Sequence, residues 1–182
     1  MVKKLKQQYE TPSEGWSKER IQKEDELIES YGLKNKKEVY KAESELRNLR
    51  REARRLIAEE DETQKKDLIE RVNGLGLVRS DAELEDILTL NTTDILNRRL
   101  QTAVDRRGHS ETVREARQLV THGHVYINGE KVNIPGYLLT QEEEEELEVR
   151  KPEPSETEEQ EETEEEEEVE GSEEENEEGD EE

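Results

Sequence analysis

A cluster of arginine, glutamine and histidine side chains recurs at helical spacing between positions 114 and 122. Their positions are i, i+3, i+4, i+7 and i+8, which lie on one face of a helix. The residues are Arg114, Arg117, Gln118, Thr121 and His122. Guanidinium groups pair with phosphate oxygens at two points, whereas amide and imidazole groups bind sugars and bases. The chemistry that this face can perform is therefore the binding of RNA.

Five arginines repeat the same spacing earlier in the chain, at Arg47, Arg50, Arg51, Arg54 and Arg55. In a helix over residues 36–60 they form one stripe, and an apolar stripe lies opposite. Like charges on one face repel each other unless anions lie across them. Two interpretations stay open: a solvated face neutralised by neighbouring glutamates, or a ridge that binds phosphate.

The elements that must position these side chains are mostly short helices. Apolar periodicity and capping residues predict helices over residues 17–30, 36–60, 61–73, 81–88, 92–107 and 110–122. The expected N-caps are Ser17, Asp81, Thr92 or Thr93, and Ser110, and glycines at positions 32, 108 and 123 are expected to end helices.

A β-hairpin is expected directly after the last of these helices. Val125-Tyr126-Ile127 alternates as a strand, Asn128-Gly129 is a two-residue turn signal, and residues 131–134 return. Residues 137–139 are a candidate for a further strand. The pattern predicts an α+β, mainly helical protein. Its N-terminal arm and helical domain span residues 1–91, a small module of helices and a hairpin spans 92–140, and a disordered acidic tail spans 141–182.

The net charge of −24 argues against a polyanionic partner only if it is averaged over the whole chain. Residues 141–182 contain 26 acidic and two basic side chains, so this segment carries the whole excess. The preceding 140 residues hold 26 of each sign. The chain is thus a charge-balanced body with a polyacidic tail, and the body can bind RNA through local cationic faces.

Composition excludes several classes of chemistry. The absence of cysteine rules out disulfides, thiolate metal sites and cysteine nucleophiles. Three histidines, His109, His122 and His124, are too few for a filled metal shell, so no metal and no cofactor is expected. No nucleophile elbow or phosphate loop is present, which favours a protein that is not an enzyme and has no small-molecule substrate.

No apolar run approaches the roughly 20 residues that a membrane span needs, and no secretory segment opens the chain. We therefore expect a soluble cytoplasmic protein without a membrane partner. The low aromatic content indicates that some elements order fully only against a partner surface. Trp16 follows turn signals, and it is either an anchor onto the body or an anchor onto RNA or a neighbouring protein.

Residues 98–137 read RRLQTAVDRRGHSETVREARQLVTHGHVYINGEKVNIPGY. This stretch resembles the RNA-binding module named after small-subunit ribosomal protein S four. Earlier segments resemble the archaeal and eukaryotic branch of that family: Tyr9-Glu10-Thr11-Pro12, the sequence YGLKNK from Tyr31 to Lys36, and the stretch from Ser44 through Leu56. The resemblance covers about residues 7–140, and the module follows a matching N-terminal region in the expected order.

The resemblance implies a structural protein of the small ribosomal subunit that binds its ribosomal RNA directly and nucleates assembly. It also implies a place near the messenger RNA entry channel, beside ribosomal proteins of the S three and S five types, and a contribution to translation accuracy. Carried over by motif, the RNA contacts are Arg98, Arg99, Gln101, Arg106, Arg114, Arg117, Gln118, His122, His124, Asn128 and Lys131. The stripe from Arg47 to Arg55 is a second contact zone.

The chain departs from the family pattern in three ways. Asp105 and His109-Ser110-Glu111 stand where aromatic, apolar or neutral residues are expected, the body is neutral where members are usually basic, and the acidic tail has no counterpart. Two rival functions therefore remain. One is a tRNA-binding or stalled-ribosome factor that reuses the module, and the other is a histone-chaperone-like scaffold whose tail binds basic partners.

Overall fold

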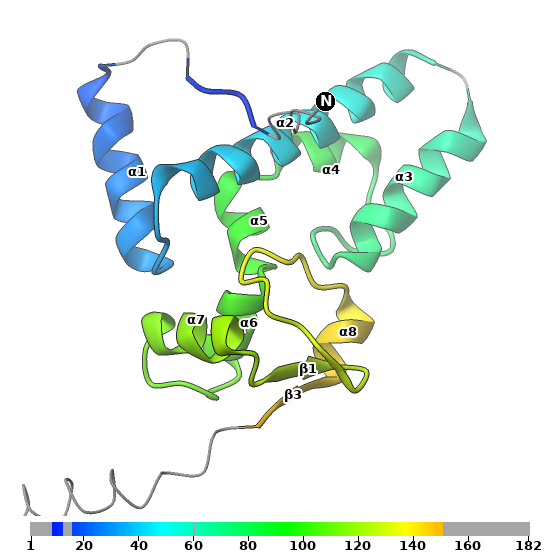
Figure 1. Ribbon diagram of the computed structural model, residues 1–182. Coiled ribbons are helices and arrows are strands. Elements are labelled where there is room, and N and C mark those ends of the chain that lie inside the picture. Colours follow the sequence, from blue (N-terminus) through cyan, green and yellow to red (C-terminus); the bar gives the residue numbers. More distant parts are fainter. Residues whose placement is uncertain (1–8, 13–15, 60, 151–182) are drawn as a thin grey trace, which may run out of the picture. The chain divides into compact units, whose positions relative to one another are not determined.

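The computed structural model describes residues 9–12, 16–59 and 61–150 of the chain (Figure 1). The expected arm before residue 9 and the expected tail beyond residue 150 lie outside these residues. The elements are α1 Lys18–Ser30, α2 Lys36–Ala58, α3 Glu62–Gly74, α4 Leu84–Thr89, α5 Thr92–Asn97, α6 Leu100–Arg106, α7 Val113–His122, β1 Val125–Ile127, β2 Glu130–Lys131, α8 Gln141–Glu145 and β3 Leu147–Val149. The expected α+β, mainly helical class is confirmed.

Two hydrophobic cores divide the described residues into lobes. The helical lobe, α1 to α5, packs around the long helix α2, which buries Val39, Ala42 and Leu56 almost completely. Burial of each larger side chain contributes about 1.5–3 kcal/mol. The hairpin lobe, α6 to β3, has its own core with Leu100 and Val120 at its centre. Ile57 lies one residue before the end of α2 and is 46% exposed.

Most helix ends lie within two residues of their predicted positions, and the caps explain the shifts. Asn91 and Asp94 form a capping box at the start of α5, and Thr112 accepts a hydrogen bond from the backbone N–H of Glu115 at the start of α7. The predictions of Thr92 or Thr93 and of Ser110 at these caps were therefore wrong. Likewise Glu83, not Asp81, caps α4.

The single helix expected over residues 92–107 is interrupted at Arg98 and Arg99. There the backbone forms a bridge with the loop that follows the hairpin: the N–H of Leu100 donates to the carbonyl of Tyr137 (2.8 Å), and the N–H of Leu139 donates to that of Arg98 (3.0 Å). This pairing is the only part of the further strand expected over residues 137–139 that forms. The chain direction changes here, so α6 starts the hairpin lobe.

The two-residue turn of the hairpin forms as predicted, but the return strand β2 spans Glu130–Lys131 and not the expected residues 131–134. Asn128 has φ 52° and Gly129 has φ 77°, the left-handed values that a type I′ turn requires. β1 pairs antiparallel with β2 and, on its other side, with β3, so the strand order is β2-β1-β3. No helix among the described residues is long and apolar enough to cross a membrane.

Residues 141–150 correct the expected boundary between module and tail. Thr140 and Glu143 form a capping box that starts α8, and β3 then pairs with β1 so that Leu147 opposes Ile127. Leu147 is 6% exposed and belongs to the core of the hairpin lobe. Leu147 and Val149 alternate as in a strand, but the many glutamates around them led to the prediction of disorder from residue 141. This predicted start was too early, because residues 141–150 contain α8 and β3.

Truncation after residue 140 is expected to destabilise the protein, whereas truncation after residue 150 is not. The shorter chain loses β3, the buried Leu147 and the carboxylate of Glu144, a loss of at least about 3 kcal/mol in the free energy of unfolding. Thermal unfolding followed by circular dichroism measures both chains, and Leu147→Ala in the full chain isolates the packing contribution. Equal unfolding temperatures for the two truncations would refute the assignment of β3 to the core.

Candidate nucleic-acid interface

Helix α7 carries the face that the sequence singled out. Thr112 caps it, Ala116 and Val120 are buried against the rest of the hairpin lobe, and Gly123 ends it at φ 77°. The opposite side is exposed, and it presents Arg114, Gln118, Thr121 and His122. Among the described residues no ion pair involves Arg114. Its guanidinium is therefore available to a phosphate.

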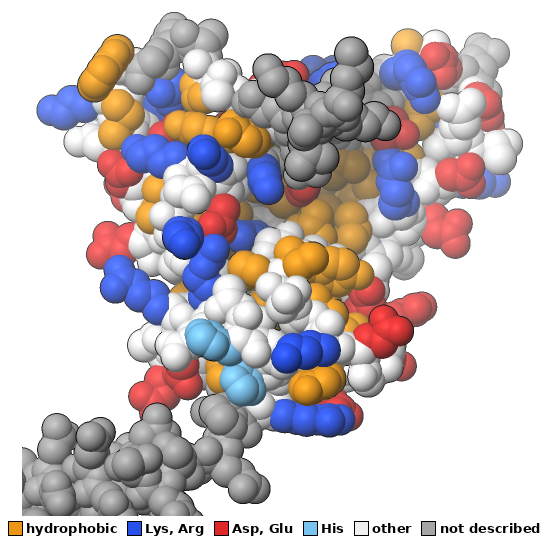
Figure 2. All heavy atoms as spheres, viewed as in Figure 1, with side chains coloured by type: hydrophobic (Ala, Val, Ile, Leu, Met, Phe, Trp, Pro, Cys, Tyr) orange, Lys and Arg blue, Asp and Glu red, His pale blue; other side chains and the backbone are white. Residues whose placement is uncertain are grey.

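The β-hairpin continues this exposed face. Asn128 and Lys131 are exposed, and the side chain of Lys131 lies over Gly123 so closely that a Cβ there would be 1.8 Å from its Cε. His124 is half-buried, and its carbonyl accepts a hydrogen bond from the N–H of Arg150 (2.8 Å). In Figure 2, histidine side chains and cationic side chains share this part of the surface.

Arg150 is a candidate contact that sequence reasoning missed. Its guanidinium lies 4.4 Å from the centre of the Tyr126 ring, which is cation–π geometry. The side chain itself is 65% exposed. The signal that could have located it is the two-residue alternation of Leu147 and Val149, which places position 150 at the end of a strand beside His124.

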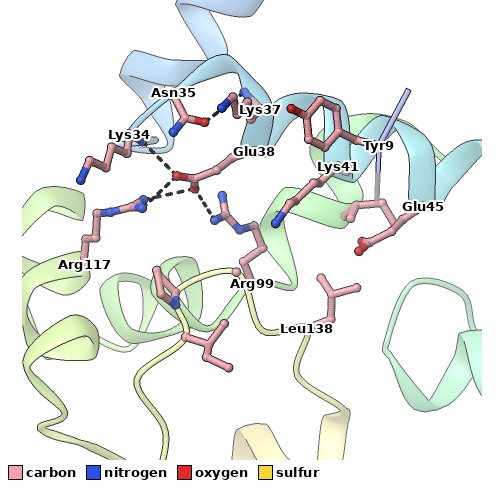
Figure 3. A pocket seen from close by; sticks show the side chains of 15 residues that line it. Tyr9, Lys34, Asn35, Lys37, Glu38, Lys41, Glu45, Arg99, Arg117 and Leu138 are labelled. Atoms are coloured by element: carbon pink, nitrogen blue, oxygen red, sulfur yellow. Dashed lines mark hydrogen bonds and ion pairs between the residues drawn. The ribbon is translucent and has the colours of Figure 1, made fainter. Parts of the chain in front are cut away.

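Arg99 and Arg117 form an internal network with Glu38 instead of an exposed contact with RNA (Figure 3). Arg99 Nη2 lies 2.5 Å from Glu38 Oε2, and Arg117 Nη2 lies 2.8 Å from Glu38 Oε1. The side chain of Arg99 is only 7% exposed. Both arginines were expected to contact RNA, and the structure uses both to hold one carboxylate of α2.

Gln101, also expected to contact RNA, lies in the interior of the protein. Its side chain is 1% exposed, and its amide nitrogen lies 3.0–3.2 Å from the carbonyl oxygens of Tyr31, Gly32 and Val113. Its amide oxygen accepts a hydrogen bond from Arg117 Nη1 (3.1 Å). Every polar group of this side chain is occupied inside the protein, so Gln101 joins the two lobes and has no group left for RNA.

Arg98 and Arg106 share the carboxylate of Glu144 on α8. Arg98 Nη1 lies 2.5 Å from Glu144 Oε2 and its side chain is 12% exposed, whereas the side chain of Arg106 is 47% exposed. Arg98 is therefore internal, and only Arg106 keeps a solvent-facing edge. Burial alone would raise the pKa of Glu144, but hydrogen bonds from Arg106 and Arg98 outweigh it and hold the pKa below its ordinary value.

The arginine stripe on α2 is partly neutralised. Arg47 pairs with Glu10, Arg50 donates to the carbonyl of Leu90, and Arg55 donates to Gln64 Oε1 (3.2 Å) and pairs with Glu59 (3.7 Å). Arg51 donates to Asn48, while Arg54 is exposed and has no such partner among the described residues. Arg47, Arg50 and Arg55 thus have partners within the protein, and Arg51 and Arg54 form no ion pair with a described residue. Phosphate binding by this stripe stays a prediction.

The Glu38 network is expected to make folding stability depend on pH. Burial alone would raise the pKa of Glu38, but hydrogen bonds from Arg117 and Arg99 lower it below the ordinary value of 4.5. A carboxyl group with a lowered pKa stabilises the fold above its unfolded pKa, and this contribution is lost as pH falls through the folded pKa.

Glu38→Gln is therefore expected to cost about 2 kcal/mol at pH 7, since two guanidinium groups lose their carboxylate. The difference from the unsubstituted chain should shrink below pH 4.5 and disappear at lower pH. Urea unfolding at a series of pH values measures it, with Glu70→Gln on the exposed face of α3 as the matched control. A pH-independent difference between the two chains would contradict the role of the Glu38 charge.

Comparison with known proteins agrees with this geometry. The S4 domain family matches residues 98–145, a range that runs from the break before α6 through α8. The match therefore extends past residue 140 and includes α8, which the structure also assigns to the folded part of the chain.

Three archaeal relatives carry the name small ribosomal subunit protein uS4. The protein of Methanosphaera stadtmanae is 44% identical over 149 residues, which cover 80% of this chain and 82% of the relative. That of Methanothermobacter thermautotrophicus is 43% identical over 148 residues, with 80% and 86% covered. That of Methanococcus aeolicus is 44% identical over 147 residues, with 79% and 83% covered. These names are those of structural proteins and not of enzymes. At this identity and coverage, the chain belongs to the uS4 family of small ribosomal subunit proteins.

Proposed function

We propose that this protein is a structural component of the small ribosomal subunit and binds its ribosomal RNA directly. Membership of the uS4 family supports the ribosomal role. The observation that carries direct RNA binding is the exposed face of α7 and the hairpin, where the cation Arg114 has no ion-pair partner among the described residues. We further propose that the protein nucleates subunit assembly, lies near the messenger RNA entry channel beside proteins of the S three and S five types, contributes to translation accuracy and is cytoplasmic.

The structure narrows the set of residues that we propose to contact RNA. The primary contacts are exposed polar side chains of the hairpin lobe, together with the half-buried His124: Arg106, Arg114, Gln118, His122, His124, Asn128, Lys131 and Arg150. Arg51 and Arg54 on α2 form a second zone. Arginine and lysine contacts to phosphate give affinity that falls with salt, and amide and imidazole groups add contacts to sugars and bases. The buried Arg99 and Gln101, together with the partly buried Arg98 and Arg117, position these groups.

Replacing Arg114 and Gln118 together with alanine is expected to weaken binding to archaeal small-subunit ribosomal RNA by about tenfold or more at moderate salt, because a charge-assisted and a neutral contact are lost. The slope of log affinity against log salt should decrease by about one, as expected for one lost phosphate contact. Filter binding at several salt concentrations measures both quantities. Lys66→Ala on α3 removes an exposed charge elsewhere and is the control. Unchanged affinity would mean that the exposed face of α7 contacts solvent and not RNA.

The identity of the bound RNA separates the ribosomal role from the main rival. Ultraviolet crosslinking of the full chain in an archaeal cell extract, followed by sequencing of the bound RNA, should recover small-subunit ribosomal RNA. Recovery of mainly tRNA would favour a non-ribosomal factor that reuses the S4 domain.

A truncation after residue 150 tests the scaffold rival without disturbing the fold. This chain keeps α8 and β3 and removes a segment rich in glutamate. We expect RNA affinity to be unchanged or higher, because acidic side chains compete with phosphate for cationic groups at low salt. Loss of RNA binding, together with loss of binding to basic proteins, would support a scaffold that acts through its tail.

A further inference from the structure

A cavity of about 650 Å³ opens between the helical lobe and the hairpin lobe (Figure 3). One wall is the N-terminal part of α2 with Lys37 and Lys41, and the other includes Ile134 and Pro135 from the loop after β2. Its volume falls in the range of about 300–1,000 Å³ that is typical of sites for small ligands. None of these four residues was among the expected RNA contacts.

The charges in this cavity do not cancel. Arg99 and Arg117 are balanced in part by Glu38, to which both are bonded. Lys34, Lys37 and Lys41 also line the cavity, and their ammonium groups form no ion pair with a described residue. Glu45 is the other carboxylate of the lining, and desolvation raises its pKa, with Arg99 and Lys41 acting against this. The cavity thus has a surplus of positive charge that would favour an anion.

The opposite wall is apolar at the same place. Ile134 is 58% exposed, and Pro135 follows it in a turn that the N–H of Tyr137 closes by donating to the carbonyl of Ile134 (3.1 Å). The exposed isoleucine offers an apolar surface in the same cavity that three lysines line. A ligand that matches both walls is anionic at one end and has an apolar face at the other. A nucleotide has this chemistry, because its phosphate is charged and its base has a π-face.

We propose that this cavity receives one unpaired nucleotide of the bound RNA, with its phosphate held by Lys37 and Lys41 and its base against Ile134 and Pro135. This inference rests on the proposed binding of ribosomal RNA and adds a site for a base that is out of its stack. Proteins that recognise RNA by sequence take up such splayed bases from loops and bulges, whereas paired bases remain in the helix. The Glu38 network fixes both walls and therefore the width of the site.

Two variants of the full chain separate the phosphate contact from the base contact. Lys37→Ala/Lys41→Ala is expected to weaken binding to archaeal small-subunit ribosomal RNA by about tenfold, and to lower the salt slope by about 0.7, the value for one phosphate of a single strand. Ile134→Ala is expected to weaken binding by roughly fivefold and to leave the slope unchanged, because only apolar contact is lost. Lys37, Lys41 and Ile134 are exposed, so the unfolding temperatures of both variants should equal that of the Lys66→Ala control.

Crosslinking distinguishes a nucleotide bound in the cavity from non-specific attraction of RNA to the lysines. Ultraviolet irradiation of the complex with the same RNA, followed by mass spectrometry, should find a nucleotide attached to the peptide that contains Ile134 and Tyr137. Binding by both variants equal to that of Lys66→Ala, while Arg114→Ala/Gln118→Ala remains weak, would overturn the nucleotide site and leave the proposed function intact. Failure of the unsubstituted chain to bind this RNA would overturn both. If the same irradiation of assembled subunits links this peptide only to an acidic protein and not to RNA, the nucleotide site is overturned and the occupant of the cavity is an acidic peptide.

Discussion

One carboxylate, that of Glu38, holds the two lobes of the described structure together. It stands in the first turn of α2 and accepts hydrogen bonds from Arg99, at the break between α5 and α6, and from Arg117 on α7. The amide of Gln101 adds a second link from α6 to the carbonyls at the end of α1. Because the side chain of Glu38 is 16% exposed, water competes weakly for these bonds. The exposed face of α7 is thus fixed relative to α2, and the cavity between the lobes keeps its shape.

The same arrangement recurs at the other end of the hairpin lobe, where Glu144 binds Arg98 and Arg106. In both places one carboxylate pairs with two arginines from the range of the S4 domain match and balances one of their two positive charges. This division of roles explains how a chain with an even charge balance in its body can present cations to RNA. The less exposed arginines share a carboxylate in pairs, whereas exposed cations such as Arg114 and Lys37 have no ion-pair partner among the described residues.

The sequence predicted the local structure well and the role of individual arginines less well. Hydrophobic spacing and the left-handed residues at Gly123 and Asn128 identify helix ends and the hairpin, since these features depend on neighbours in sequence. Arg99 and Gln101 carry no local sign of burial, because their partners lie 61 to 70 positions away in the chain. For the same reason β3 escaped notice: its pairing partner is β1, and its own composition is that of the acidic tail.

The position of the positive charge matters more for RNA binding than its total. Coulomb interactions between exposed groups are screened over about 8 Å at physiological salt, so carboxylates elsewhere on the surface weaken a phosphate contact only slightly. A guanidinium that already holds a carboxylate has lost most of its value for phosphate, whatever the net charge of the chain. The arginines that a motif comparison selects are therefore of two kinds in this protein. Arg99 and Arg117, bonded to Glu38, and Arg98, bonded to Glu144, hold the fold together. Exposed residues such as Arg114 and Lys131 are the ones that we propose as contacts to RNA.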